Sequence, residues 1–142
     1  MARRVVLDTN VVVTALRSGR GASAAVLLRA GTGQFEFCIS VALFLEYESA
    51  LKRPEAGIRL SFAAIDDILD HLAAVGRQQE IFFLWRPLLP DPADDHVLEL
   101  AVAGQCGAIV TYNRRDFRGA ERFGIDIVSP PEFLLELRSE AP

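Results

Sequence analysis

VVLDTN, residues 5–10, is the stretch that decides the fold, because an apolar run ends there at an acid and two further polar residues. Aliphatic and β-branched residues at this length predict a buried strand over Arg4 to Asp8. A charge at the end of a buried strand is costly unless it is paired or bound to a ligand. Asp8 is therefore a candidate functional residue, and the alternative role is a helix cap before Val11.

Acids accompany the other apolar runs in a similar way. Glu46 lies inside an apolar helical stretch, and Asp94 and Asp95 open the helix that leads to AIV, residues 108–110. Asp116 follows that run closely. In an open parallel sheet, ligands bind beyond the carboxyl ends of the strands, so these acids are expected to meet at one edge. Their mutual repulsion favours a bound divalent cation.

Strand-like and helix-like segments alternate along the chain, which predicts a parallel sheet covered by helices on both faces, in one domain. Ser40, Ser61 and Asp94 are expected N-caps, and SPPE, residues 129–132, is expected to form a capping box. The expected strands are residues 4–8, 35–39, 81–85, 108–111 and 125–128, and the expected helices, caps included, are residues 11–16, 22–30, 40–54, 61–72, 94–102 and 133–137.

The composition is typical of one compact domain. The 142 residues are 51% hydrophobic and 24% charged, a balance that excludes a disordered chain. No apolar run approaches the ~18 residues of a membrane span. Asp8 interrupts the apolar start that a signal peptide would need, so the cytoplasm is the expected location. Cys38 and Cys106 lack the spacing of a metal or redox site and are expected to be core residues.

The helical acids fall into pairs, and one member of each pair is the better candidate for the site. Glu48 has a lysine four residues later, as in an ordinary exposed helix pair, so Glu46 is the better candidate for facing inward. Asp94 is most simply an N-cap, which leaves Asp95 as the candidate ligand. Asp95 and Glu99 share a helix face, which is unfavourable unless water or a cation lies between them.

The net charge of −4 is the opposite of what a nucleic-acid-binding protein usually carries, so the placement of basic residues matters more than their sum. All but one of the fifteen basic residues are arginines, which suit phosphate oxygens. Arg17, Arg20, Arg114 and Arg115 lie in expected loops near the acids, where they either contact phosphates or stay solvated. The two histidines are expected to be surface or satisfied residues, and no catalytic triad is evident.

Taken in order, these residues resemble the PIN-domain family along nearly the whole chain. Each motif alone is common, whereas the ordered set is specific, and it most resembles the branch that contains the toxins of toxin–antitoxin pairs. The matching segments are VLDTN (6–10), Ser40 and Leu43 ahead of Glu46 with LKRP (51–54) behind it, Asp95 with Leu98, Leu100, Ala101 and Gly104, VTYN (110–113) with Asp116 and Phe117, and IVSP (127–130).

The resemblance implies one PIN-like domain over residues 1–142, a three-layer α/β/α sandwich with a parallel five-stranded sheet in the order 3-2-1-4-5. It implies metal-dependent cleavage of RNA, in which Asp8, Glu46, Asp95 and Asp116 hold the Mg²⁺ or Mn²⁺ that activates a water. It also implies a homodimer and a cognate antitoxin as partner, without a membrane. The auxiliary residues would be Thr9, Asn10, Asp94, Glu99, Thr111 and Asn113, which support the carboxylates.

One position departs from the family pattern, because residue 113 is often Asp and is Asn113 here. The missing carboxylate lowers the charge available to a second metal, so the first metal position is the stronger expectation. A PIN-like module that binds RNA or protein without cutting therefore stays open.

Two further alternatives are weaker. A phosphotransferase of the haloacid-dehalogenase type would need a second Asp two residues after Asp8 and a downstream lysine. The chain has Asn10 at that place, and Lys52 is its only lysine. A receiver-like signalling domain lacks the lysine expected after a late strand in the same way.

Overall fold

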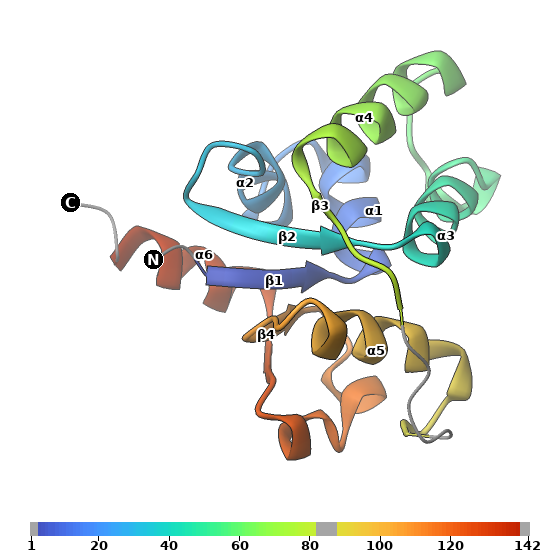
Figure 1. The fold of residues 1–142 in the computed structure, drawn as a ribbon. Coiled ribbons are helices and arrows are strands. Elements are labelled where there is room, and N and C mark those ends of the chain that lie inside the picture. The colour runs from blue at the N-terminus through green and yellow to red at the C-terminus, as the bar shows by residue number, and fades with distance from the viewer. Residues whose placement is uncertain (1–2, 82–87, 140–142) are drawn as a thin grey trace.

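The computed structural model describes residues 3–81 and 88–139, and its centre is a five-stranded parallel sheet in the order β3-β2-β1-β4-β5 (Figure 1). This confirms the expected fold class and strand order. The strands are β1 (Arg3–Leu7), β2 (Phe35–Ile39), β3 (Arg77–Gln78), β4 (Ala108–Val110) and β5 (Asp126–Val128). The α-helices are α1 (Thr9–Ser18), α2 (Ala22–Leu28), α3 (Val41–Leu51), α4 (Phe62–Val75), α5 (Asp95–Ala103) and α6 (Pro130–Ser139), and the 3-10 helices are η1 (Pro54–Ala56), η2 (Pro92–Asp94), η3 (Arg114–Phe117) and η4 (Ala120–Phe123).

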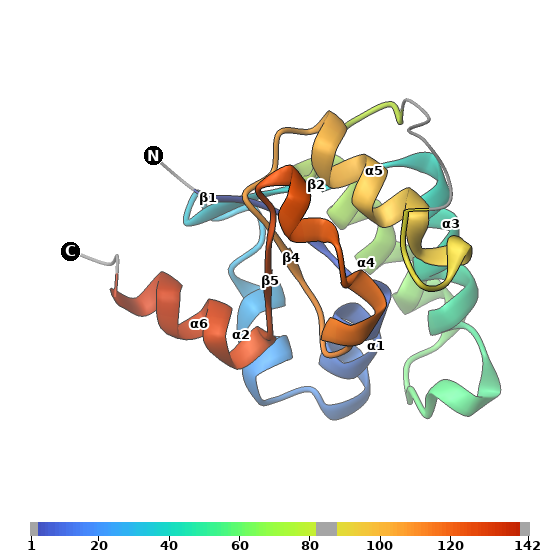
Figure 2. The ribbon, with the colours of Figure 1, turned by 90° about the horizontal axis from the view of Figure 1, so that it is seen from below.

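Helices cover both faces of the sheet. Figure 2 shows α5 on one side and α1, α2 and α6 on the other. From β1 the chain moves outward to β2 and β3, and it then returns past β1 to β4. Because crossovers between parallel strands are right-handed, this reversal places the helices before and after it on opposite faces. The carboxyl ends of β1 and β4 thus form the switch point of the sheet, the position at which open α/β sheets carry their ligand-binding crevice.

Among the residues that the structure describes, the third strand of the sheet is not the segment expected over Ile81 to Trp85. The third strand, β3, lies earlier, and it pairs with Cys38 and Ile39 at the end of β2. Residues 82–85 lie outside the described residues. Both residues of β3 are polar and exposed, so no apolar run marks this edge strand in the sequence. Gly76 ends α4 with an extended backbone (φ −75°, ψ 155°), which starts β3 at once.

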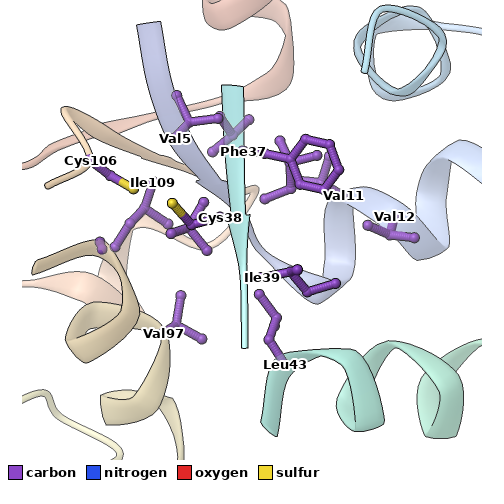
Figure 3. Close-up of a cluster of buried hydrophobic side chains, with 14 of the residues drawn as sticks. Val5, Val11, Val12, Phe37, Cys38, Ile39, Leu43, Val97, Cys106 and Ile109 are labelled. Atoms are coloured by element: carbon purple, nitrogen blue, oxygen red, sulfur yellow. The ribbon is translucent and has the colours of Figure 1, made fainter. Parts of the chain in front are cut away.

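The central strands are buried on both faces, as parallel strands between two helix layers must be. Val5, Phe37 and Ile109 belong to one cluster with side chains from α1 and α3 (Figure 3). Cys38 and Cys106 are buried free thiols in the same cluster, which confirms that they are core residues. Within the described part of the chain, no single helix could span a membrane, and α1 with α2 reaches the necessary length only as a pair bent by 101°.

The expected helix starts are confirmed by hydrogen bonds. Ser40 and Ser61 each accept an amide hydrogen bond from three residues later, both at 3.1 Å. At the start of α6, Ser129 N–H donates to Glu132 Oε1 at 2.9 Å, and Glu132 N–H donates to Ser129 Oγ at 3.3 Å. The caps at Ser40 and Ser129 fix where α3 and α6 begin after the carboxyl ends of β2 and β5, and the cap at Ser61 fixes where α4 begins after η1.

A methyl group at Gly76 is expected to destabilise the protein. A Cβ there would lie 2.6 Å from Phe37 Cε2 and 2.8 Å from the Leu72 carbonyl oxygen, and the backbone oxygen cannot move aside. We expect Gly76→Ala to lower the free energy of unfolding by about 1–3 kcal/mol in urea denaturation. Gly107→Ala is the matched control, because its Cβ would approach nothing closer than 3.4 Å. Equal stability of the two variants would contradict this packing.

Candidate active site at the carboxyl edge of the sheet

The centre of the site is the place where β1 and β4 end side by side. Leu7 pairs with Val110 in the parallel register, and Asp8 and Thr111 come next on the two strands. Thr111 Oγ1 donates a hydrogen bond to Asp8 Oδ2 at 2.7 Å. Both residues lie at the reversal of strand order, which is the usual ligand site of an open α/β sheet.

Thr9 and Asn10 follow Asp8 into α1 and complete this network. Asn10 Nδ2 donates to Asp8 Oδ2 at 3.3 Å, and Asn10 Oδ1 accepts the N–H of Tyr112 at 3.2 Å. Thr9 N–H donates to Asp8 Oδ1 at 2.9 Å, so Asp8 caps α1. The capping role that the sequence left as an alternative is thus confirmed, while the other carboxylate oxygen of Asp8 faces Thr111.

The surroundings of Asp8 act on its ionisation in opposite directions. Burial raises the pKa of Asp8, which is 9% exposed, and the negative charges of Glu46 and Asp116 raise it further. The hydrogen bonds from Thr111 and Thr9 lower the pKa, because they stabilise the ionised carboxylate. Any positive charge bound beside Asp8 would therefore relieve a repulsion that the fold itself creates.

Glu46 reaches this edge from α3, as expected, whereas Glu48 pairs with Lys52 at 3.1 Å. Thr9 Oγ1 donates a hydrogen bond to Glu46 Oε2, and His96 Nε2 lies 3.4 Å from Glu46 Oε1. The hydrogen bond with His96 is the main reason that the pKa of Glu46 is lowered. Glu46 is thus the carboxylate of the site with a partially compensated charge.

His96 is a residue of this site that the sequence analysis missed. It was expected to be a surface or satisfied histidine, but its side chain is only 17% exposed. Its Nδ1 atom is buried and has no hydrogen-bond partner among the residues that the structure describes. The only available signal was its position directly after two aspartates at the start of α5.

Asp94 and Asp95 lie in surroundings that differ from those expected, in which Asp94 capped the helix and Asp95 was the metal ligand. Asp94 occupies the N-cap position of α5, as expected, but its side chain makes no capping hydrogen bond. Its pKa is raised to about 6, first by burial and then by the charges of Asp116, Asp8, Asp91 and Glu46. Asp95 is fully buried, and its carboxylate accepts the N–H of Leu89 at 2.9 Å and that of Leu88 at 3.3 Å. Asp94 therefore faces the other acids, while Asp95 holds the loop ahead of η2.

The other expected site residues lie around this centre. Asp116 is half-buried on η3, and its charge acts on both Asp8 and Asp94. Asn113 is exposed, and its N–H donates to Thr111 Oγ1 at 3.0 Å. Glu99 is fully buried on α5, one turn after Asp95.

The four arginines differ in their freedom to meet a phosphate. Arg17 and Arg20 are exposed near the end of α1. Arg114 forms an ion pair with Glu132 at the start of α6. Arg115 is exposed, and no ion pair of its guanidinium occurs within residues 3–81 and 88–139. Within the part of the chain that the structure describes, Arg115 thus keeps a guanidinium outside any ion pair, whereas the charge of Arg114 is offset by Glu132.

Four acids thus act on one another at this edge: Asp8, Glu46, Asp94 and Asp116. Glu46 and Asp116 are close enough for their negative charges to raise the pKa of Asp8 and that of Asp94. Within the described residues, no three acids, histidines or cysteines already stand together as a set of metal ligands. All four offer carboxylate oxygens, the ligands that Mg²⁺ and Mn²⁺ prefer.

Removal of the Asp94 charge is expected to stabilise the metal-free protein at neutral pH. The pKa of Asp94 is raised from 3.8 to about 6, so the folded state keeps a proton that the unfolded state loses, and stability falls as the pH rises through that window. In EDTA at pH 7.5 we expect Asp94→Asn to raise the free energy of unfolding by about 1 kcal/mol, after allowance for solvent screening. At pH 3.5 this difference should vanish.

Urea denaturation at the two pH values measures this effect, and Asp67→Asn, on the exposed side of α4, is the control for loss of one negative charge. A gain in Asp67→Asn as large as that in Asp94→Asn would contradict a local repulsion at Asp94.

Asp95 is expected to be needed for stability. Asp95→Ala would leave the buried amide of Leu89 and the half-buried amide of Leu88 without their acceptor, at a cost of about 2–4 kcal/mol. Urea denaturation measures the loss, and hydrogen exchange at those two amides should accelerate. Asp91→Ala is the matched control in the same loop. Within residues 3–81 and 88–139 its exposed carboxylate accepts one hydrogen bond, from the N–H of Ala93, so its loss should cost about 1 kcal/mol. An equal loss in both variants would refute this role of Asp95.

Comparison with known proteins supports one family. Fourteen chains of solved structures match this chain. One is VapBC2 from Rickettsia felis bound to a DNA fragment from their promoter, with a TM-score of 0.59 and 15% identity, covering 89% of this chain and 98% of that chain. At this identity the similarity establishes a shared fold. No match is found among curated proteins.

A family model of the PIN domain matches residues 4–115. The matched segment contains β1 with Asp8, α3 with Glu46, and the start of α5 with Asp94. The matched segment thus contains three of the four acids of the cluster, and Asp116 lies one residue beyond it. The chain therefore belongs to the PIN-domain family.

Proposed function

We propose that this protein is a metal-dependent ribonuclease that hydrolyses phosphodiester bonds of RNA and acts as the toxin of a toxin–antitoxin pair. The observation that carries the proposal is the convergence of Asp8, Glu46, Asp94 and Asp116 at the crevice between β1 and β4. A structural protein would gain nothing from gathering four acids of like charge at a ligand-binding edge, because their repulsion costs stability. A cation and an anionic substrate at this place would use that arrangement.

The donor set fits a hard divalent cation. The proposed ligands are carboxylate oxygens of Asp8, Glu46, Asp94 and Asp116, which suit Mg²⁺ or Mn²⁺. When bound, such an ion supplies Lewis-acid chemistry, with activation of a water and stabilisation of the leaving oxygen. The raised pKa of Asp94 supports the fit, because the charges that raise it are the ones that a cation would offset.

This proposal differs from the sequence-based ligand set at one position. Asp94 takes the place of Asp95 as a ligand, because the carboxylate of Asp95 already accepts two backbone N–H groups. Asp95 would instead hold the loop that precedes Asp94. Thr111 would orient Asp8, and Thr9 would orient Glu46. Asn113 supplies an amide where a further carboxylate would strengthen a second metal position.

The proposed partners rest on the family resemblance and on one surface. An apolar cavity of about 320 Å³ opens between α1, α2 and α4, and the neighbouring side chain of Leu28 is 79% exposed. An antitoxin segment that covers this cavity would remove the apolar surface from water. A homodimer and a cytoplasmic location complete the proposal, and the fold similarity to VapBC2 is consistent with a paired antitoxin.

The proposal is tested by incubation of purified protein with a labelled RNA pool in Mg²⁺, in Mn²⁺ and in EDTA. We expect cleavage only when a metal ion is present. The cleavage rate should fall by more than about 100-fold in Asp8→Asn and in Asp94→Asn, because loss of even an outer-shell partner of a metal ligand lowers activity by about 10–100-fold. Calorimetric titration with Mn²⁺ gives a second readout, and both variants should bind the ion more weakly. Asp67→Asn controls for general loss of charge.

The non-catalytic PIN-like module is the alternative outcome. Folded protein that cleaves no RNA with either metal would contradict the nuclease proposal. Asn113→Asp then distinguishes two causes, because a gain of Mn²⁺ affinity and of cleavage would locate the defect at the second metal position.

A further inference from the structure

A second pocket adjoins the acidic cluster on the side of β4 and β5. Its volume is about 560 Å³, within the range of small-molecule sites. Its lining includes Asp116 of the acidic cluster, Thr111, which donates a hydrogen bond to Asp8, and Ser129 at the start of α6. A group bound here would therefore lie directly beside the proposed cleavage site. The remaining lining residues are Tyr112, Asn113, Arg114 and Arg115.

Tyr112 gives this pocket a fixed aromatic wall. Its side chain is 43% exposed, although both ends of the residue are held. The Tyr112 hydroxyl is hydrogen-bonded to the buried Ser23 of α2, and its backbone N–H donates to Asn10 Oδ1 at 3.2 Å. A ring that is held at its hydroxyl and exposed on its surface loses little freedom when a flat ligand stacks on it.

Arg115 gives the same pocket its unpaired positive charge. The neighbouring Arg114 forms an ion pair with Glu132, which also accepts the N–H of Ser129. Arg115 is exposed and has no such partner among the described residues. An aromatic surface and an exposed guanidinium in one pocket match the two parts of a nucleotide, because bases stack on aromatic rings and arginine binds phosphate oxygens.

We propose that this pocket is a subsite for one unpaired nucleotide of the RNA substrate, with the base stacked on Tyr112 and its phosphate held by Arg115. The inference rests on the proposed nuclease function and adds to it two residues of this chain that would position the nucleotide next to the cleaved bond. A base inside a duplex is already stacked on its neighbours, so it cannot reach the ring. The subsite would thus select unpaired regions of RNA before any base identity is read.

The test measures binding apart from cleavage. A pool of fluorescein-labelled single-stranded RNA hexamers is titrated with full-length protein in Ca²⁺, and fluorescence anisotropy gives the Kd. We expect Tyr112→Ala to raise the Kd about tenfold, in the range of base–aromatic stacking. Tyr112→Phe keeps the ring and loses only the hydroxyl contact with Ser23, so its Kd should stay within about twofold of the wild type.

The electrostatic half of the subsite has its own control pair. Arg115→Gln should weaken binding and reduce the slope of log Kd against log salt by about 0.7, the value for one phosphate contact on a single strand. Arg118→Gln removes an equal charge from an exposed residue outside this pocket and should change neither quantity. A blunt RNA duplex should compete poorly with the hexamers.

A direct readout avoids dependence on the fold of any variant. Hexamers that carry 4-thiouridine should crosslink, on irradiation, to the peptide that contains Tyr112 in the wild-type protein. Unchanged Kd values in Tyr112→Ala and Arg115→Gln, equal competition by the duplex, or crosslinks confined to other peptides would each overturn the subsite.

The two proposals fail in distinguishable ways. If the protein cleaves RNA with metal but Tyr112→Ala binds the hexamers as tightly as the wild type, the nuclease function is supported and the subsite is refuted. The expected binding pattern without cleavage would keep the subsite and remove the catalytic proposal.

Discussion

The pairing of β1 with β4 is the constraint on which the site depends. The paired residues Leu7 and Val110 are 103 positions apart in the sequence, and β2, β3 and α1 to α5 all lie between these two strands in the chain. Their register brings Asp8 beside Thr111, and the hydrogen bond between the two follows directly. Because the order of strands reverses at this pair, no helix crosses above it, and the edge stays open.

The clustered carboxylates repel one another, and hydrogen bonds from neighbouring residues offset this repulsion for some of them more than for others. Asp8 receives hydrogen bonds from Thr9 and Thr111, and Glu46 receives them from Thr9 and His96. Asp94 has no capping bond, and its pKa rises to about 6. The residual negative potential is concentrated where the crevice opens, which is the place where a cation would stabilise the folded chain most.

The pocket beside this cluster adds groups that suit an RNA substrate to the carboxylates that suit a metal ion. Tyr112 and Arg115 come from the segment that follows β4, immediately after Thr111. The strand end that positions a carboxylate partner therefore also positions an aromatic ring and a guanidinium. This short segment thus brings two kinds of group together. Arg115 suits a phosphate, and the ring of Tyr112 suits an unpaired base.

The sequence by itself determined the alternation of strands and helices, the caps at Ser40, Ser61 and Ser129, and the acids at Asp8 and Glu46, because periodicity and local hydrogen bonding are written in neighbouring residues. Only the tertiary structure decided between adjacent acids and located the polar strand β3. Asp94 and Asp95 have equal chemistry, and what separates them is the direction each side chain takes: one toward acids from three other segments, the other toward the amides of Leu88 and Leu89. Contacts of that kind come from distant segments, and no local pattern encodes them.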